Sequence, residues 1–431
     1  MLHERRALGL SAAGDVNGEG VEGRVRAILE DVRQNGLAAL LKFTVKFDSE
    51  TFTEKQLCVD EKTIQEAVKS VDKHDLDIIL AAASNIRGFH EAQKEKSWFV
   101  TRPDGSVLGQ KVSPVGRAGL YIPGGRGGDT PLISSLLMTA IPAQAAGVEQ
   151  IAVVTPPRKD GSVNPYILAA AHLLGVKEIY ACGGPWAIAA LAFGAGPIKP
   201  VDVIAGPGNI WVATAKRLLI GQVGIDMVAG PSEVLIWADA GARPDFVAAD
   251  MLSQAEHDSL ASAVCITDSA ELADALKLEL AVQLEALPRA DIAAESLRRF
   301  GAIVLVSNIS QALDLINAIA PEHLELICNN PWEVMPKISN AGAIFMGAYA
   351  PEALGDYYAG PNHVLPTMGT ARFASALSAQ TFCKKTSIIA ASQELALAGA
   401  DAVARLARLE NLEGHAKSVE IRREKIDANC D

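Results

Sequence analysis

The sequence predicts an α/β fold with two parallel-sheet domains, a helical N-terminal segment and a helical C-terminal arm. Short apolar runs alternate with helical stretches at βαβ spacing, first from Gly119 and again from Glu233. Hydrophobic residues make up 49% of the 431 residues, which is enough for a large buried core. Each block is therefore expected to form a parallel sheet with helices on its faces.

Charge and composition argue against several classes of protein. Lys and Arg total 39 against 51 for Asp and Glu, and this net charge of −12 disfavours nucleic acid or an anionic membrane as the main partner. The best apolar run, 186–196, is shorter than the roughly 18 residues that span a bilayer, and the N-terminus lacks the apolar core of a secretory signal. The six cysteines are scattered without a CxxC pair, as in reduced proteins. We expect a cytoplasmic protein without a thiolate zinc site.

The first hundred residues predict helices followed by a hairpin. Residues 24–42 show helical apolar spacing with one break at Asn35-Gly36, and residues 62–71 and 74–96 continue in the same style. From Trp98, short apolar runs are separated by Pro-Asp-Gly and Pro-Val-Gly, which are turn signals between strands.

The two alternating blocks supply the strands of the sheets. In the first block, the run from Gly119 enters the glycine-rich loop 123–128, and three more runs follow, at 151–155, 178–182 and 201–205. In the second block, five short apolar runs predict strands, at 233–237, 263–267, 302–306, 324–328 and 343–346. From 393 to 425 the chain is helical and charged, with an interruption at Gly414.

Two glycine-rich turns of the first block are candidates for ligand binding. The loop 123–128 and the turn Gly206-Pro207-Gly208-Asn209 both follow a strand and precede a helix, where backbone amides can meet a phosphate. The strict GxGxxG pattern is missing, and each turn alone is also compatible with an ordinary α/β connection. Two such turns at the strand ends of one sheet favour a binding crevice.

Gln254 and His257 form half of a candidate metal site. Pro244 suits the first turn of a helix, and Val247 and Met251 share one face with Gln254, so that Gln254 points toward the core with His257 one turn on. An amide and an imidazole on an inward face could both ligate a metal. The alternative is a hydrogen-bonded polar pair at the end of a helix.

Three further groups carry titratable side chains. Glu322 and His323 enter a predicted strand, and a carboxylate beside an imidazole suits proton transfer, although two exposed loop residues would look the same. The loop 355–363 combines Asp356 with aromatic residues and a histidine between glycines, as binding loops or structured turns do. Glu410 and His415 lie in the tail near Gly414, where a solvated helix end is the alternative.

Taken together, these residues resemble the histidinol dehydrogenase family over nearly the whole chain, from about Arg24 to Arg422. The motifs that carry the resemblance are GLYIPGG, GPGNIWVATAK, IDMVAGPSEVLI, DMLSQAEHD, IAPEHLEL, GDYYAGPNHVLPTMGTARF and GHAKSVEIR. The family oxidises L-histidinol to L-histidine through L-histidinaldehyde in two hydride transfers to NAD, the last step of histidine biosynthesis.

The resemblance implies roles for individual residues. One zinc ion per subunit would be bound by Gln254, His257, Asp356 and His415, whose nitrogen and oxygen donors are acceptable to Zn²⁺. Glu322 and His323 would be the acid–base pair. The residues that would contact the substrate are Ser232, Gln254, His257, His323, Asp356, Glu410 and His415.

Tyr121 and Asn209 match family positions that touch NAD, and Trp186 stands where the family usually has a glutamine in a Gly-Gly-x-Gln turn. An indole cannot copy the hydrogen bonds of that glutamine, although it could stack on a ring or pack.

The resemblance also implies an architecture. It consists of two Rossmann-like, incomplete parallel-sheet domains in an intertwined homodimer, whose active sites are shared because each C-terminal arm reaches the other subunit. The expected parts are an N-terminal helical segment (1–23), a metal and substrate domain (24–120 with 232–377), an NAD domain (121–231) and a helical arm (378–431).

Three other functions are compatible with parts of this pattern. A paralogous zinc and NAD alcohol dehydrogenase could act on another small polar alcohol such as a sulfopropanediol, although Glu410, placed to meet an amino group, favours an amino alcohol. A zinc hydrolase would use the metal to activate water. The two glycine turns disfavour this function, because a hydrolase needs no dinucleotide crevice. A non-catalytic metal-binding protein would not need the pair Glu322 and His323.

Overall fold

The computed structural model describes residues 20–427, and contacts divide the chain into two compact units. The larger unit holds the residues through Gln93 together with Val115–Phe382, and the smaller unit holds Lys94–Pro114 with the chain from Cys383. Most of the predicted segment 1–23 lies outside the described residues. This division puts both sheets into one unit, so the four predicted domain ranges stay predictions.

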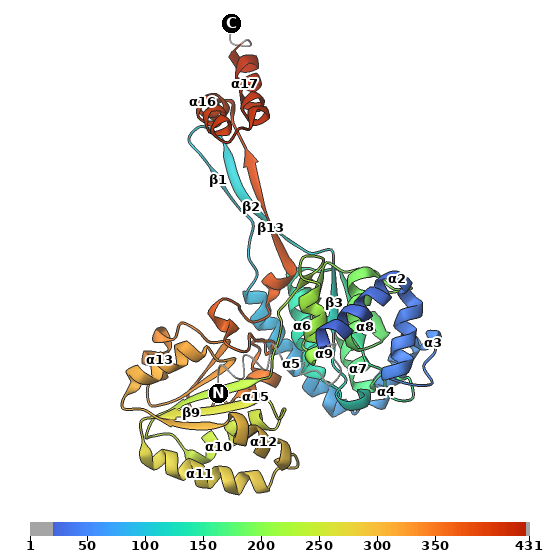
Figure 1. The fold of residues 1–431 in the computed structure, drawn as a ribbon, viewed down its shortest axis with the longest axis vertical. Helices are drawn as coiled ribbons and strands as arrows, with labels where there is room; N and C mark the ends of the chain where they lie inside the picture. The colour runs from blue at the N-terminus through green and yellow to red at the C-terminus, as the bar shows by residue number, and fades with distance from the viewer. Residues whose placement is uncertain (1–19, 428–431) are drawn as a thin grey trace. The chain divides into compact units, whose positions relative to one another are not determined.

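The first sheet has five parallel strands in the order β5-β4-β3-β6-β7 (Figure 1). All five residues of β3 are buried, as expected for a parallel sheet that is covered on both faces. The strands are β3 (Arg117–Tyr121), β4 (Gln150–Thr155), β5 (Glu178–Ala181), β6 (Val203–Ala205) and β7 (Gly224–Ile225). The helices between them are α6 (Ile133–Ala146), α7 (Pro165–Leu173), α8 (Gly184–Phe193) and α9 (Ile210–Leu218).

The N-terminal helices pack against the helices of this first sheet. Helix α2 (Val21–Phe47) contacts α8 and α9, and it bends at Gly36, whose φ of 50° and ψ of −123° are not helical. The predicted break at Asn35-Gly36 is thus a kink inside one long element. The remaining helices are α3 (Glu54–Leu57), α4 (Glu61–Ser70), which contacts α7, and α5 (Lys73–Ala92), which contacts α6.

The second sheet repeats the same strand order, as β10-β9-β8-β11-β12, and is also parallel. Its strands are β8 (Glu233–Ala238), β9 (Ser262–Thr267), β10 (Ala302–Leu305), β11 (His323–Ile327) and β12 (Ala343–Met346). Its helices are α10 (Pro244–Ala255), α11 (Ala270–Glu285), α12 (Ala290–Phe300), α13 (Ile309–Ile319), α14 (Pro331–Val334) and α15 (Glu352–Leu354). The prediction of two parallel-sheet blocks is confirmed, with bounds of the predicted strands that differ by at most two residues, and the short strand β7 was not predicted.

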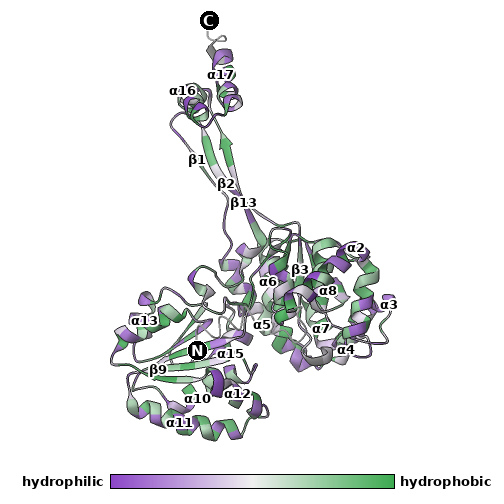
Figure 2. Cartoon of the chain, in the orientation of Figure 1, coloured by the Kyte–Doolittle hydropathy of each residue, from purple (hydrophilic) through white to green (hydrophobic). Residues whose placement is uncertain are grey.

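Alternate residues of each strand in the second sheet face different helices. Val234 and Ile236 pack with Val247 and Met251 of α10, whereas Leu235 on the same strand packs on the side of α13. The strands of both sheets are coloured as hydrophobic in Figure 2. The face toward α10 is the one that bears the candidate site.

The smaller unit contains a three-stranded antiparallel sheet and two helices. Strands β1 (Trp98–Thr101) and β2 (Val107–Pro114) form the predicted hairpin. Strand β13 (Cys383–Ala390) pairs with β2, and this part of the predicted helical arm is therefore a strand. Its Lys-Lys-Thr-Ser stretch lacks the apolar run by which the other strands were found.

The helical end of the arm breaks before Gly414. Helix α16 (Gln393–Leu409) and helix α17 (Glu413–Asp427) are separated at Asn411, which takes a left-handed φ of 60°. His415 therefore lies in the first turn of α17, and the interruption predicted at Gly414 occurs three residues earlier, at Asn411. Within residues 20–427, no helix combines the length and the hydropathy that a membrane span requires.

Candidate active site

The first side chain of β11, His323, lies at the amino edge of the second sheet on the face toward α10. His323 and Glu325 share this face, because side chains of a strand alternate. Helix α10 runs over the same face and presents Asp250 and Gln254, which are four residues apart and so one above the other. The buried side chains of His323 and Glu325 thus lie on the same face as the buried Gln254 and the half-buried Asp250 of this helix.

The imidazole of His323 has one nitrogen bound and one nitrogen without a partner. Nδ1 lies 3.1 Å from the backbone carbonyl oxygen of Glu233, and since a carbonyl only accepts, Nδ1 carries the proton. Nε2 is buried and has no hydrogen-bond partner among residues 20–427, with Oδ1 of Asp356 3.8 Å away. Burial lowers the pKa of His323 to about 3. The ring is a neutral base whose lone pair is at Nε2.

The neighbouring Glu322 is fixed to the same strand. Its Oε2 accepts a hydrogen bond of 2.9 Å from the backbone amide of Glu233 and lies 3.8 Å from Nδ1 of His323. Both side chains are buried, with 5% and 3% of their surface exposed, so they are not the exposed loop pair that the sequence also allowed. Glu233, the first residue of β8, therefore holds both members of the predicted acid–base pair through its backbone.

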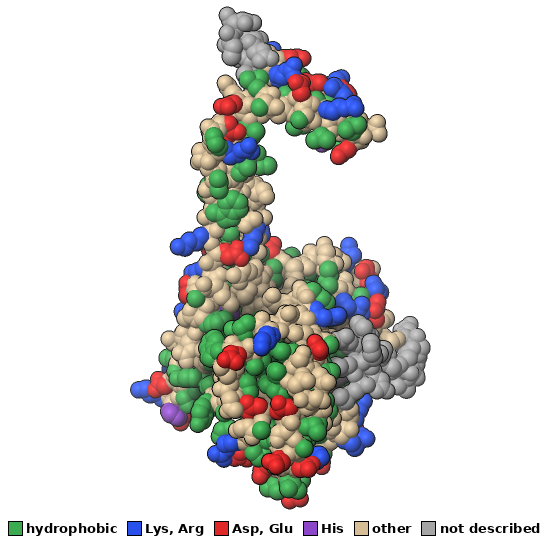
Figure 3. Space-filling view, turned by 90° about the vertical axis from the view of Figure 1, so that its left-hand side faces the viewer, with side chains coloured by type: hydrophobic (Ala, Val, Ile, Leu, Met, Phe, Trp, Pro, Cys, Tyr) green, Lys and Arg blue, Asp and Glu red, His purple; other side chains and the backbone are tan. Residues whose placement is uncertain are grey.

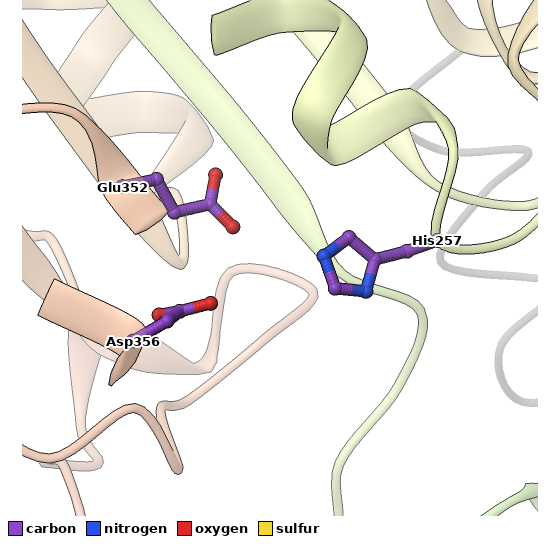
Figure 4. Close-up of side chains that lie close together, drawn as sticks. All are labelled: His257, Glu352 and Asp356. Atoms are coloured by element: carbon purple, nitrogen blue, oxygen red, sulfur yellow. The ribbon is translucent and has the colours of Figure 1, made fainter. Parts of the chain in front are cut away.

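Three side chains from two segments form a candidate metal cluster. One ligand atom each of His257, Glu352 and Asp356 lies within 4.8 Å of the others, and in Figure 4 the three side chains point toward one another. His257 follows α10 and is exposed, whereas Glu352 is buried. His257 and Asp356 were predicted from the sequence; Glu352 was not.

Gln254 is buried beside this cluster. One terminal atom of its amide lies 3.0 Å from each carboxylate oxygen of Glu352 and 3.2 Å from Nδ1 of His323. Gln254 has no exposed surface. The structure thus brings Gln254, His257, Asp356 and His323 together on one face of the second sheet.

The segment that carries the two carboxylates is held by three hydrogen bonds. The backbone amide of Glu352 donates to Oε1 of Glu325 at 2.9 Å, and Nδ1 of His363 donates to the backbone carbonyl of Asp356 at 3.1 Å. Asn85 donates to the carbonyl of Tyr358 at 2.9 Å. The five residues Gly355–Ala359 form a single π-helical turn, a conformation that is frequent at functional sites.

Burial raises the pKa of the acidic groups around His323. Burial is the main cause at Glu352, where the pKa is well above its usual value, and the nearby carboxylates, led by Asp356, raise it further. Burial also raises the pKa of Asp356 to about 7. Such a cluster is costly when ionised unless protons or a cation compensate its charge. Its oxygen and nitrogen donors fit a divalent cation such as Zn²⁺.

Glu352 could have been found from its spacing. It lies four residues before Asp356, so that a helical turn places both carboxylates on one side. Asp250 has the same relation to Gln254, and it hydrogen-bonds Glu325, whose pKa is raised first by burial and then by Asp250.

The remaining predicted substrate residues lie in different places. Ser232 directly precedes β8 at the amino edge of the second sheet, and its carbonyl accepts from the amide of Ser262 at 3.0 Å. Glu410 and His415 are exposed residues of the smaller unit, at the end of α16 and in α17. Because the two units are described separately, their part in the site stays a prediction.

The predicted cofactor residues lie at the carboxyl ends of strands in the first sheet or in the turns that follow them. Tyr121 ends β3, and its hydroxyl accepts from the amide of Gly184 at 3.3 Å. Asn209 caps α9 by accepting from the amides of Trp211 and Val212. Strand order reverses between β3 and β6, which is where open parallel sheets bind ligands.

The turn before Asn209 is held from beneath by a buried ion pair. Lys216 donates to the carbonyl of Gly206 at 2.8 Å, Asp226 accepts from the amide of Gly206 at 2.8 Å, and Lys216 and Asp226 pair with each other. Gly206 has a φ of 125°, which L side chains rarely adopt. Both the N–H group and the carbonyl group of Gly206 are therefore held by hydrogen bonds.

Trp186 packs against α2. Its ring stacks with Phe43 and Phe47, with centroid distances of 6.0 Å and 5.3 Å, and only 6% of its surface is exposed. Of the two roles that the sequence allows for this indole, these contacts match packing.

Comparisons with known proteins identify the family of this chain. The model of the histidinol dehydrogenase family matches residues 12–423. A histidinol dehydrogenase from Oleidesulfovibrio alaskensis is 61% identical over 93% of this chain and 93% of its own length. One from Bacillus subtilis is 49% identical over 97% of each. The crystal structure of histidinol dehydrogenase from Elizabethkingia anophelis superposes with a TM-score of 0.90 at 36% identity, covering 99% of this chain and 97% of that one.

The match extends over nearly the full length of each chain, so it includes both sheets and the arm. The chain therefore belongs to the histidinol dehydrogenase family, oxidoreductases of histidine biosynthesis.

Proposed function

We propose that this chain oxidises L-histidinol to L-histidine through L-histidinaldehyde, with NAD as hydride acceptor and one zinc ion per subunit. The observation that carries the proposal is the unpartnered Nε2 of buried His323 beside the cluster of His257, Glu352 and Asp356. A base with a free lone pair next to candidate metal ligands suits the oxidation of an alcohol that must be both oriented and deprotonated.

His323 would accept the hydroxyl proton of the substrate at Nε2. Nδ1 keeps its proton and its hydrogen bond to the carbonyl oxygen of Glu233, so the ring keeps its orientation while it becomes an imidazolium. The carboxylate of Glu322, 3.8 Å from Nδ1, would stabilise this positive charge. The metal would supply orientation of the substrate's nitrogens and the nicotinamide would accept the hydride in each of the two oxidations.

Glu322 would act in the second oxidation by accepting a proton from the water that adds to the aldehyde carbon. His323 gives its first proton to solvent before the second oxidation. The hydrated aldehyde then loses its second hydride as His323 accepts the remaining hydroxyl proton at Nε2, which leaves the carboxylate of histidine. One water is consumed and two hydrides are transferred. Gln254, His257 and Asp356 would hold the metal together with His415.

His415 and Glu410 would reach the site from a second copy of the chain. The smaller unit leaves large hydrophobic side chains uncovered on its strands and helices, as Figure 3 shows. Their exposed fractions are 58% for Phe99, 75% for Ile389 and 61% for Leu409. Apolar surface of this kind is typical of an interface between subunits, and we propose an intertwined homodimer with shared active sites.

The test of the proposed reaction counts reduced nicotinamide per substrate. Purified protein is mixed with L-histidinol and excess NAD, with and without a zinc chelator, and the absorbance of NADH is followed. Two NADH per histidinol, lost on chelation and restored by zinc, are expected. Reduction with another polar alcohol but not with histidinol would contradict the substrate, and a chelator-insensitive rate would contradict the metal.

A truncation tests the shared site. A chain that ends after Gly399 loses most of α16 and all of α17, and it should lose activity and zinc retention together. A full-length chain with Asp401→Ala, which removes only an exposed carboxylate paired with Arg423, is the control. Full activity and stoichiometric zinc in the truncated protein would contradict the shared site.

A further inference from the structure

Glu325 lies where the three elements that carry the candidate site meet. It is the third residue of β11, exposes only 1% of its surface, and lies on the same face of the sheet as His323. The other two elements are helix α10 and the segment that begins at Glu352 with α15. The side chain of Glu325 is hydrogen-bonded to both of them.

The bond to the Glu352 segment is made to its backbone. The amide of Glu352 donates to Oε1 of Glu325 at 2.9 Å. Glu352 is the first residue of α15, where a backbone amide has no acceptor within its own helix, so Glu325 supplies one. One turn further on lies Asp356, and in Figure 4 the carboxylates of Glu352 and Asp356 point toward His257. Glu325 therefore fixes the start of the turn that carries two members of the metal cluster.

The bond to α10 is made between two carboxyl groups, those of Glu325 and Asp250. Asp250 lies one turn before Gln254 on the same side of α10, and His257 follows the end of this helix. Glu325 thus joins the helix that leads to His257 to the strand that carries His323.

The stability of the fold does not explain an acid at this position. Burying a carboxyl group between a helix and a strand costs free energy, whereas an apolar side chain packed there would not incur that cost. The two bonds of Glu325 lead to the two segments that supply His257, Glu352 and Asp356. This favours a role at the site.

We infer that Glu325 is a positioning residue, which holds the Glu352–Asp356 segment and α10 at the spacing that lets the three side chains of the metal cluster converge. This inference rests on the proposed zinc function. Glu325 acts through the backbone of Glu352 and through Asp250, and it binds no metal itself. Partners of this kind typically change metal affinity by about 10- to 100-fold when they are removed.

Two substitutions of Glu325 separate its hydrogen bonds from its charge. Glu325→Gln keeps the length of the side chain, an oxygen that can accept from the amide of Glu352 and an NH₂ group that can donate to Asp250. Glu325→Asp keeps the carboxyl group but is one methylene shorter, so it falls short of its partners. Positioning predicts that glutamine replaces Glu325 and that aspartate does not.

Hydrogen exchange reports the bond directly. Exchange of peptides that cover residues 350–359 is measured by mass spectrometry in the metal-free protein, so neither zinc nor substrate is needed. We expect exchange about tenfold faster in Glu325→Asp and within about twofold of the wild type in Glu325→Gln. Zinc affinity, measured by competition with a chromophoric chelator, should fall about 10- to 100-fold in Glu325→Asp and stay within about twofold in Glu325→Gln.

Two results would overturn the inference. Wild-type exchange and zinc affinity in Glu325→Asp would remove the role, and a loss in Glu325→Gln as large as in Glu325→Asp would show that the charge matters rather than the bonds. Glu178→Asp is the matched control, because it shortens a carboxylate that pairs with Arg117 in the first sheet, and it should change neither quantity. A wild-type protein that binds no zinc would contradict the proposed function instead, and the exchange would still decide whether Glu325 holds the segment.

The folding of each variant is checked by thermal unfolding of the metal-free protein. If Glu325→Asp does not fold, the comparison is made at the half-buried Asp250, the partner of Glu325 on α10. Asp250→Ala removes this bond and should weaken zinc binding, whereas Asp250→Asn can still accept from Glu325 and should stay near the wild type. Equal zinc affinities of these two variants would contradict positioning.

Discussion

His323 and Glu233 are joined by a hydrogen bond of 3.1 Å from Nδ1 to a backbone carbonyl oxygen, across two adjacent parallel strands. Because the acceptor is backbone, it cannot be lost by substitution or by a change of pH. The bond leaves the lone pair on Nε2, the atom without a partner.

This geometry predicts one tautomer and one kinetic effect. Nitrogen NMR of the protein labelled at histidine should show a neutral His323 with its proton on Nδ1. His323→Asn should lower kcat by about 10²- to 10⁴-fold, as loss of a general base does, while the zinc content stays unchanged. His74→Asn, the same change at an exposed histidine, is the control; a comparable loss there would show that the effect is not specific to the site.

Breaking the buried ion pair of Lys216 and Asp226 should lower both the stability of the fold and the affinity for NAD. Lys216 and Asp226 expose 3% and 0% of their side chains, so Lys216→Met leaves a buried carboxylate unpaired and should cost about 3–5 kcal/mol of unfolding free energy. NAD binding, measured by calorimetry, should weaken because the turn before Asn209 loses its support.

An exposed pair provides the comparison. Lys42 and Asp31 lie 2.8 Å apart with 62% of the lysine side chain exposed, so Lys42→Met should cost less than about 1 kcal/mol. Replacing both partners, as Lys216→Met with Asp226→Leu, should recover part of the stability. A double variant as unstable as the sum of the two single variants would contradict this account.

Asp48 predicts a pH dependence of stability. Burial raises its pKa to about 7, although the amide of Gly183 donates to it and acts in the opposite direction. The folded state thus holds a proton that the unfolded state, with its lower pKa, releases. Stability contributed by this group is complete below about pH 4 and is lost as the pH rises to about 7.

The measurement compares Asp48→Asn with the wild type. Between pH 5 and pH 8, the wild type should lose about 1–2 kcal/mol more unfolding free energy than the variant, since Asp48 is only half-buried. Asp60→Asn is a control, because Asp60 is an exposed helix cap whose pKa is lowered by its bonds to Thr63. Identical pH profiles of wild type and Asp48→Asn would contradict the prediction.

The stack of Trp186 with Phe43 and Phe47 predicts that substitutions of Trp186 affect the stability of the fold more than the binding of NAD. Trp186→Phe keeps an aromatic ring between Phe43 and Phe47, so the KM for NAD should stay within about twofold, and the loss of stability should be modest. Trp186→Gln restores the family residue but removes the stack, and it should cost about 3–5 kcal/mol. A large rise in the KM of Trp186→Phe at unchanged stability would instead indicate a direct contact with NAD.

The sequence predicts most of both sheets because their signals are local. Each buried parallel strand appears as a short apolar run, and the expected run 343–346 coincides with β12. The antiparallel strand β13 was missed because it is exposed on most of its residues, so no apolar run marks it, and its partner β2 lies far away in the sequence.

The candidate site divides in the same way. His323, Gln254 and Asp356 were found by their motifs, whereas the bonds that orient them come from residues distant in the chain. Glu233 lies 90 positions from His323, and Glu352 stands outside the motif that begins at Gly355, so that only its spacing of four residues from Asp356 could have indicated it. The motifs identify the candidate reacting side chains. The backbone atoms that hydrogen-bond to these side chains depend on which strands are neighbours in the sheet, and this order cannot be read from a motif.

The sheet of the smaller unit has a consequence for how the chain is made. Val107 to Pro114 pair with Ala390 to Cys383, so β2 must wait until roughly 270 further residues have left the ribosome. At about 5–20 residues per second, this delay lasts roughly 13 to 55 seconds. During that time the hairpin β1–β2 has no third strand, and a lone hairpin is only marginally stable in water. The three-stranded sheet of the smaller unit can therefore form only after nearly the whole chain has been translated.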